Sequence, residues 1–272
     1  MSRLIEPSVP GDIEIKIRSI LRAAAYVEDH LQELIRIGDM AEKAGYSIFH
    51  FCRIFNAVTG HSPYDYQIKR KLSEALPLLS TGKASVTRVA LEFGFETPEG
   101  FSRAFKRMFG ILPSGLKNGA VLDPRLSLLP VTRGYLSDLH SCNFKPARGQ
   151  FDKTEYFGIT DHHARVAESL QRSRFDEGMA VIDYHPDWET KGIQIFLQKK
   201  TAQALKAVTG GGSYIVFSPG CPVTKIDSFL YYIYSVFCRR EGGPESLPTR
   251  IILKVKHGVV THLRFAKYPK AC

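Results

Sequence analysis

The first part of the chain contains the same stretch of sequence twice, about 50 residues apart. A shift of 50 residues pairs Ser47 with Thr97, Phe51 with Phe101, Arg53 with Arg103, Phe55 with Phe105, Gly60 with Gly110 and Pro63 with Pro113. Further upstream a shift of 49 pairs Ile37 with Val86, Ala41 with Ala90, Gly45 with Gly94 and Tyr46 with Phe95. A repeat of this kind predicts one structural unit built twice in succession.

Each repeat begins with a short amphipathic segment, 37–44 in the first and 86–93 in the second. Gly45 and Gly94 follow these segments. Because glycine readily adopts the left-handed conformation that closes a helix, each segment is predicted to be a helix that ends at its glycine.

A second helix is predicted to begin a few residues later in each repeat. Ser47 and Thr97 are suited to the N-cap position, and Pro98 to the first helical position. Apolar residues then recur at helical spacing and predict one buried face per helix. These residues are Phe51, Ile54, Phe55 and Val58 in the first repeat, and Phe101, Phe105, Met108 and Phe109 in the second. The repeat is therefore predicted to be helix, tight turn, helix, twice.

The opposite face of each second helix carries mostly polar or basic residues. It carries Phe49, His50, Cys52, Arg53 and Asn56 in the first repeat, and Glu99, Ser102, Arg103, Lys106 and Arg107 in the second. Side chains placed in this way can reach base edges in the major groove while the preceding helix braces the backbone. A helical bundle without a ligand is the alternative that the pattern leaves open.

The segment 94–113 resembles the signature of the AraC/XylS transcription regulators, and 37–55 with 60–63 resembles the other helix-turn-helix of that family. The resemblance covers Ile15 to Lys117. It implies an all-α, homeodomain-like domain of seven helices with two helix-turn-helix motifs at 13–118, and double-stranded DNA as its partner.

The resemblance also implies which side chains contact DNA. The base readers would be Phe49, Cys52, Arg53, Pro98, Glu99, Ser102 and Arg103, and the phosphate contacts Lys106 and Arg107. Arg53 and Arg103 can each donate two hydrogen bonds to guanine, with a phosphate contact or a salt bridge as the alternative role. Cys52 departs from the family, in which a longer polar side chain is common, and the operator sequence cannot be deduced.

A connecting helix is predicted over 64–79. Its inward residues would be Leu72, Ala75, Leu76 and Leu79. Pro77 lies inside this segment, and proline removes one helical hydrogen bond and clashes with the preceding turn. We therefore expect a kink or an early end before Ser80, with a consequence for the spacing of the two motifs.

The sequence changes character after Asn118, where turn signals predict a linker and entry segment at 119–149. The remainder, 150–272, is predicted to be an α+β domain with an antiparallel sheet. The predicted strands are Glu155 to Thr160, Met179 to Tyr184, Gly192 to Gln198, Ser213 to Ser218, Thr249 to Lys256 and Val259 to Phe265, and the predicted helices are His163 to Gln171 and Ile226 to Arg240.

Several fragments of this second half resemble the gyrase-inhibitor-like effector-binding domain: 155–159, 183–187, 212–220 and 247–253. The resemblance implies two βαββ halves around a groove for small molecules that are often cationic and aromatic. Its candidate ligand residues are Tyr156, Trp188, Tyr214, Phe217, Tyr231, Tyr234 and Arg250. For each aromatic residue a place in the core is the alternative. Arg250 replaces a glutamate that pairs with cationic ligands, which favours an anionic or neutral ligand, or none.

The charge, apolar runs and cysteines of the chain bear on other classes of function. The net charge is +10, and residues 43–118 hold 11 Lys and Arg against 5 Asp and Glu, so +6 of it lies in the segment with both predicted recognition helices. The longest apolar run, 229–237, is about half the ~20 residues of a spanning helix, and neither a membrane segment nor a secretion signal is expected. Five cysteines without a C-x-x-C pair fit reduced thiols in a cytoplasm.

No hydrolase, zinc-protease or phosphate-loop motif occurs, so we expect no enzyme, no cofactor and no metal site. Cys221 would be a nucleophile or redox sensor only if its pKa were lowered. The favoured function is a bacterial transcription regulator whose second half binds an effector or a protein partner, RNA polymerase being one. A ligand-sequestering protein with a weakened DNA-binding domain is the main alternative, and a small-molecule hydrolase the third.

Overall fold

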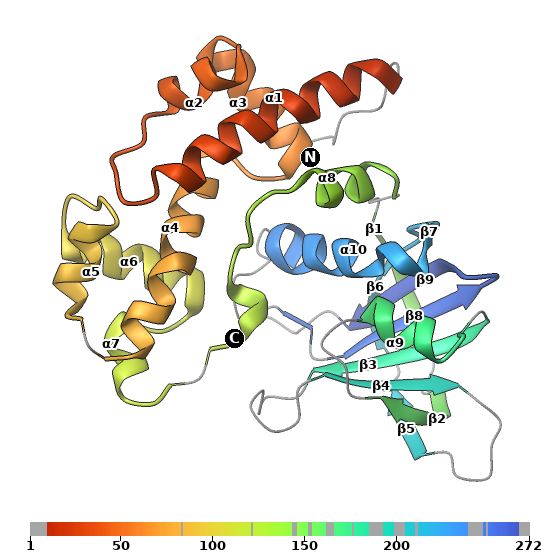
Figure 1. Cartoon of the computed structure of the whole chain (residues 1–272). Coiled ribbons are helices and arrows are strands. Elements are labelled where there is room, and N and C mark those ends of the chain that lie inside the picture. Colours follow the sequence, from red (N-terminus) through yellow and green to blue (C-terminus); the bar gives the residue numbers. More distant parts are fainter. Residues whose placement is uncertain are drawn as a thin grey trace. The chain divides into compact units, whose positions relative to one another are not determined.

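The computed structural model describes residues 10–82, 84–120, 122–142, 146–151, 154–161, 166–175, 177–184, 193–198, 205–209, 212–238, 247–248 and 250–266. The chain forms two compact units (Figure 1). One comprises Met1–Ser137 with Tyr234–Glu245, and the other comprises Asp138–Ile233 with Ser246–Cys272. Each unit is described by itself below.

The described part of residues 10–118 consists of seven α-helices. They are α1 (Pro10–Asp29), α2 (Ile37–Ala44), α3 (Ile48–Thr59), α4 (Pro63–Ser80), α5 (Val86–Glu92), α6 (Pro98–Phe109) and α7 (Pro113–Lys117). The pairs α2–α3 and α5–α6 are the two predicted helix-turn-helix motifs, and α4 connects them (Figure 1). A short 3-10 turn, Pro124–Leu126, and helix α8, Arg133–His140, follow in the segment predicted to be a linker.

The turns between paired helices have the predicted backbone conformation, but their caps differ. Gly45 and Gly94 have φ of 78° and 67°, in the left-handed region. At the start of α6, the Thr97 hydroxyl accepts a hydrogen bond from the backbone N–H of Gly100 at 3.0 Å. Ser47 stands at the N-cap of α3, yet its hydroxyl makes no capping hydrogen bond. The two motifs therefore share a backbone path without sharing every stabilising contact.

Aromatic side chains form the core of both motifs. Phe51 and Phe55 on α3 have ring centroids 5.4 Å apart, and Tyr66 of α4 packs on Phe55 at the same distance. On α6, Phe101 and Phe105 lie 5.8 Å apart. Each of these rings is fully buried, which stabilises the fold by roughly 1.5–3 kcal/mol per side chain. The predicted apolar faces are confirmed.

Helix α4 continues through Pro77 to Ser80, so the expected early end is wrong. Pro77 lies in the last turn of the helix, where the one hydrogen bond that it removes leaves the rest of the helix intact. The N–H of Thr81 still bonds to the carbonyl of Pro77 at 3.2 Å. Three of the predicted inward residues are buried, and the fourth, Leu76, is half-buried.

The second unit contains a nine-stranded sheet in its described part, and every strand pair is antiparallel, as predicted. The strands are β1 (Pro146–Phe151), β2 (Thr154–Asp161), β3 (Gly178–Tyr184), β4 (Ile193–Gln198), β5 (Leu205–Thr209), β6 (Gly212–Phe217), β7 (Cys221–Pro222), β8 (Arg250–Lys256) and β9 (Val259–Ala266). Their order is β1-β6-β9-β8-β3-β4-β2-β5, with β7 beside β9. The six predicted strands are present; β1, β5 and β7 were not predicted.

Two helices interrupt the strands of this unit: α9, Val166–Arg172, and α10, Ile226–Tyr232. The chain continues from α10 as a π-helical segment, Ile233–Cys238. The order strand, helix, strand, strand occurs as β2-α9-β3-β4 and again as β6-α10-β8-β9, the second time with the two-residue strand β7 between β6 and α10 (Figure 1). The middle of the sheet joins these two halves where β3 pairs with β8.

Candidate nucleic-acid interface

Helix α3 presents a mixed apolar and basic face to solvent. The Phe49 side chain is 75% exposed. Exposure of a large apolar ring to water does not stabilise a folded protein. His50 and Arg53 are also exposed, and Cys52 is half-buried. The Arg53 guanidinium lies 5.9 Å from the centre of the Phe49 ring, so these two predicted base readers lie together on one surface.

Helix α6 presents a more strongly charged face. Glu99, Arg103, Lys106 and Arg107 are exposed, and the other two predicted base readers, Pro98 and Ser102, are half-buried. Within the part of the chain that the structure describes, neither Arg103 nor Arg53 forms a salt bridge with a carboxylate. The salt-bridge alternative for these two arginines therefore has no support among the described residues.

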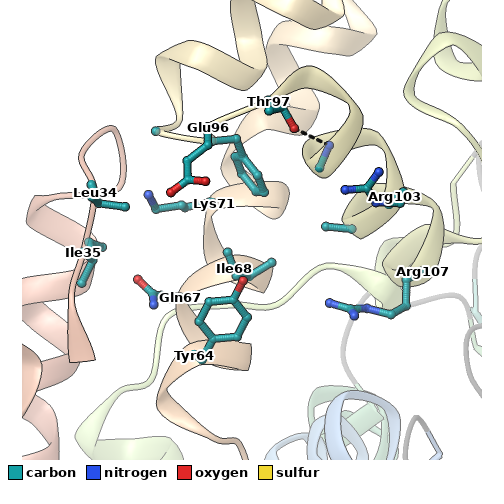
Figure 2. Close-up of a pocket in the computed structure, with 14 residues that line it drawn as sticks. Leu34, Ile35, Tyr64, Gln67, Ile68, Lys71, Glu96, Thr97, Arg103 and Arg107 are labelled. Atoms are coloured by element: carbon teal, nitrogen blue, oxygen red, sulfur yellow. Dashed lines mark hydrogen bonds between the residues drawn. The ribbon is translucent and has the colours of Figure 1, made fainter.

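A hollow of about 590 Å³ lies between α4 and α6. Figure 2 shows Arg103 and Arg107 on the α6 side and Tyr64 and Gln67 on the α4 side. The dashed line in the same view is the Thr97 cap at the start of α6. Two arginines on one wall of this hollow give α6 a positively charged surface.

Lys71 of α4 connects both motifs from within the protein. Its side chain is 3% exposed. The ammonium group donates to the carbonyl of Glu33, in the connection that leads to α2, and to the carbonyl of Phe93 at the end of α5, at 2.9 Å in the second case. Burial lowers the pKa of Lys71 to about 8. One side chain thus fastens the start of the first motif and the turn of the second to the same helix.

Arg70, the neighbouring residue, fastens α4 to α1. It is 2% exposed, and its guanidinium donates to Glu28 at 2.6 and 2.8 Å and to Glu74 at 2.7 Å. The hydroxyl of Tyr66 also donates to Glu28, at 3.0 Å. Burial lowers the pKa of Arg70, but its hydrogen bonds to the two glutamates outweigh burial and raise it. The guanidinium is therefore a permanent, paired charge.

The sequence reasoning did not identify Lys71 and Arg70, although the sequence contained a signal for Lys71. Lys71 precedes the predicted inward residues Ala75 and Leu79 by one and two helical steps of four residues, so it lies on their face. A lysine on an inward face needs buried acceptors, and here they are main-chain carbonyl groups.

The candidate ligand residues of the second unit are dispersed. Tyr214 is buried beside Val181 and Ile252. Phe217 is fully buried, with its ring centroid 5.6 Å from that of Phe229.

The remaining candidates have other settings. Tyr231 is half-buried on α10. Tyr234 belongs to the first unit, where the guanidinium of Arg125 lies 5.1 Å from its ring centre. Tyr156 lies on β2 and its side chain is outside the described part, as is the whole of Trp188.

Arg250 forms an ion pair with Asp183, the residue opposite it on β3. The hydrogen bond to Asp183 raises the pKa of Arg250 against the effect of burial. Its charge is therefore paired with a carboxylate, and its contact with a ligand stays a prediction.

Comparison with known proteins matches residues 40–119 to a helix-turn-helix domain family. The Tn10 TetD protein of Escherichia coli is 34% identical over 89 residues, which are 33% of this chain and 64% of TetD. The right origin-binding protein of E. coli K12 is 35% identical over 89 residues, 31% of its length. The chain thus matches less than two thirds of either relative. No helix among the described residues has the length and apolar character to cross a membrane.

The multiple antibiotic resistance protein MarA of Salmonella typhimurium is 30% identical over 120 residues, which are 44% of this chain and 92% of MarA. Among solved structures, an AraC-type regulator from Chromobacterium violaceum is 25% identical, with a TM-score of 0.35, over 37% of this chain and 90% of that one. The match to nearly the whole of MarA, together with the two motifs, gives the family: the chain belongs to the AraC family of helix-turn-helix, DNA-binding transcription regulators.

Proposed function

We propose that this protein regulates transcription by binding a specific double-stranded DNA site with α3 and α6 in successive segments of the major groove. The observation that carries the proposal is the pair of helix-turn-helix motifs whose second helices expose Arg53 and Arg103 without a carboxylate partner among the described residues. Major-groove segments on one face of B-DNA are about 34 Å apart, which suits two motifs joined by one helix.

The two recognition helices are suited to different contacts. Helix α3 offers Phe49 for the methyl group of thymine and Arg53 for guanine O6 and N7. Helix α6 offers Arg103 for guanine, with Lys106 and Arg107 placed for phosphate groups. The contacts of α6 are therefore mostly electrostatic and those of α3 partly apolar.

This division predicts different salt dependences. Each phosphate contact that is lost reduces the slope of log K against log salt concentration by about one unit, whereas the loss of an apolar contact leaves the slope unchanged. Arg107→Ala should therefore flatten the slope and weaken binding to all sequences alike, and Phe49→Ala should weaken binding only at the specific site.

The decisive experiment selects genomic DNA fragments with the full-length protein at ~150 mM salt, where non-specific phosphate binding is weak. One sequence should be enriched, and Arg53→Ala or Arg103→Ala should each cost ~1–3 kcal/mol at that site. Lys256→Ala, which removes an exposed positive charge of β8, is the matched control and should change nothing. If no sequence is enriched, the chain does not act as a site-specific regulator, and the ligand-sequestering alternative takes its place.

For the second unit we propose effector binding by a gyrase-inhibitor-like domain. Support comes from the order strand, helix, strand, strand, which occurs twice around the β3–β8 pair. Titration of the full-length protein with rhodamine 6G, a cationic aromatic dye, and with salicylate, an aromatic anion, tests this role by calorimetry. If neither probe releases or absorbs heat at concentrations up to ~1 mM, the second unit does not bind such ligands, and a protein partner such as RNA polymerase becomes the favoured alternative.

A further inference from the structure

The hollow between α4 and α6 contains a buried amide that has no hydrogen-bond partner. Gln67 of α4 is 4% exposed and lines this hollow of about 590 Å³ (Figure 2). Its side chain makes no hydrogen bond with any residue that the structure describes. Buried polar groups in proteins are almost always hydrogen-bonded, so the partner of this amide has to come from a molecule that enters the hollow.

The other side of the hollow carries two cations. Arg103 and Arg107 of α6 are exposed, and neither pairs with a carboxylate in the described part of the chain. Tyr64 of α4 is 60% exposed, and its hydroxyl also lacks a hydrogen-bond partner among the described residues. Figure 2 shows Tyr64 between Gln67 on one side and Arg107 on the other. The hollow thus has cations at one end and an amide at the other.

The remaining charged groups of the hollow do not oppose an anion at the arginine end. Lys71 is buried, and its ammonium group donates to the carbonyls of Glu33 and Phe93. Glu96 contributes an exposed carboxylate, and Figure 2 shows it on the side away from Arg107. Because a guanidinium group binds a carboxylate through two parallel hydrogen bonds, the arginine end is suited to a carboxylate ligand.

The rest of the lining is partly apolar. Leu34 is 64% exposed, Ile68 is half-buried, and the Tyr64 ring lies beside them in the lining. Pockets for small organic molecules combine apolar walls with a few polar groups and typically have volumes of ~300–1,000 Å³, a range that includes this hollow. The lining therefore fits an elongated organic molecule with a negative end, an apolar body and a polar far end.

We propose that this hollow binds a small organic carboxylate with an aromatic body and a hydroxyl group at its far end. The carboxylate accepts hydrogen bonds from Arg103 and Arg107, the aromatic body lies along Tyr64 and Ile68, and the hydroxyl bonds to the Gln67 amide. A regulatory consequence rests on the proposed function, in which Arg103 reads a base: the ligand and the specific DNA site compete for the same guanidinium group.

The first test titrates the full-length protein, without DNA, with hydroxybiphenyl carboxylate, whose hydroxyl and carboxylate lie at opposite ends of two linked rings. Calorimetry should show binding, and the uncharged carboxamide of the same molecule should bind about tenfold more weakly, as should the carboxylate to Arg107→Met. Lys106→Met is the matched control, since it removes the adjacent exposed charge of α6 but does not line the hollow. It should bind as wild type does.

Three results of this titration would overturn the proposal. One is the absence of binding at ~1 mM ligand. Another is an affinity that is unchanged in Arg107→Met, which would place the ligand elsewhere, the second unit included. The third is equal weakening in Arg107→Met and Lys106→Met, which would reduce the effect to general charge attraction.

Gln67→Leu tests the far end of the ligand. This variant keeps the size of the side chain but loses the amide, so hydroxybiphenyl carboxylate should bind about fivefold more weakly, whereas biphenyl carboxylate, which lacks the hydroxyl, should bind as it does to wild type. Far-UV circular dichroism checks that the variant is folded. Equal losses for the two ligands would contradict the assignment of Gln67 and overturn the proposal.

The last test adds the DNA site obtained by genomic selection. Saturating hydroxybiphenyl carboxylate should weaken DNA binding by wild type about tenfold, because Arg103 is occupied. Without ligand, Gln67→Leu should bind this DNA as wild type does, since an amide that is 4% exposed is out of reach of a duplex. Weaker DNA binding by ligand-free Gln67→Leu would assign the hollow to DNA and overturn the proposal. The titration without DNA keeps a failure of this site distinct from a failure of site-specific DNA binding.

Discussion

Replacing Lys71 by Met tests whether one buried ammonium group fastens both motifs to α4. Met keeps much of the apolar stem of the side chain but cannot donate to the carbonyl groups of Glu33 and Phe93. The variant also removes a buried positive charge. These two consequences have opposite signs near neutral pH, so a single measurement at pH 7 would not distinguish them.

The pH dependence does distinguish them. The pKa of Lys71 falls from its ordinary value of 10.5 to about 8 in the folded protein because the group is buried. Between these two pH values the unfolded chain holds a proton that the folded chain has released, so stability rises with pH. The slope approaches about 1.4 kcal/mol per pH unit above pH 8, and the stability gained between pH 7 and pH 9.5 is about 2 kcal/mol.

The assay is urea unfolding of wild type and Lys71→Met, followed by circular dichroism at 222 nm, at pH 7, 8, 9 and 9.5. Other ionisations contribute equally to both proteins and cancel in the difference. The stability of wild type minus that of the variant should increase by about 2 kcal/mol between pH 7 and pH 9.5. Parallel curves for the two proteins would show that Lys71 titrates normally and refute the reasoning.

Three further predictions concern single contacts of the first unit. Thr97→Ala should lower stability in urea by about 1 kcal/mol through loss of a helix cap, whereas Ser47→Ala, at the equivalent cap that makes no such bond, should leave it unchanged. Gly94→Ala should lower the free energy of unfolding clearly more than Gly82→Ala. Both glycines have φ of 67°, but a Cβ at Gly94 would lie 2.7 Å from a carbonyl oxygen, whereas a Cβ at Gly82 would touch nothing. Burial alone would raise the pKa of Asp65, but a hydrogen bond to a buried histidine and the charge of a neighbouring lysine outweigh burial and lower this pKa. The carboxylate therefore stabilises the protein above pH ~4, and this stabilisation is lost as the pH falls. Asp65→Asn should remove this part of the acid sensitivity in unfolding curves taken between pH 6 and pH 3, and a curve parallel to wild type would contradict it.

The helices of the first unit could be predicted because their signals are local. Periodic apolar residues, glycines at helix ends and Pro98 at the start of α6 act within a few residues of each other, and the structure has the helices at the predicted places. Pro77 is the exception. The prediction of an early helix end considered only the local geometry of proline. In the structure the last turn also contains Leu79, which is buried together with Ala75, and the helix continues to Ser80.

The strands that the sequence did not reveal lie at the margins of the sheet. β1 and β5 are its two edges, so each has one neighbouring strand. The residues of β1 are mostly exposed, which removes the alternation of apolar and polar side chains on which strand prediction depends. β7 is two residues long and produces no pattern. The central strands β3 and β8, which are covered by neighbours on both sides, were predicted because burial selects β-branched and apolar residues there.

The functional contacts that sequence reasoning missed all join distant residues. Lys71 binds carbonyl groups before and after it in the chain, and carbonyl groups are present at every position, so no residue type marks them. Such pairs are decided by topology. The repeat predicted the two helix-turn-helix motifs, because it repeats local patterns, but it could not predict how α4 holds them, because α4 is not part of the repeat. Changes in α4 should therefore alter the spacing of the motifs, and changes in α3 or α6 should alter the contacts within one of them.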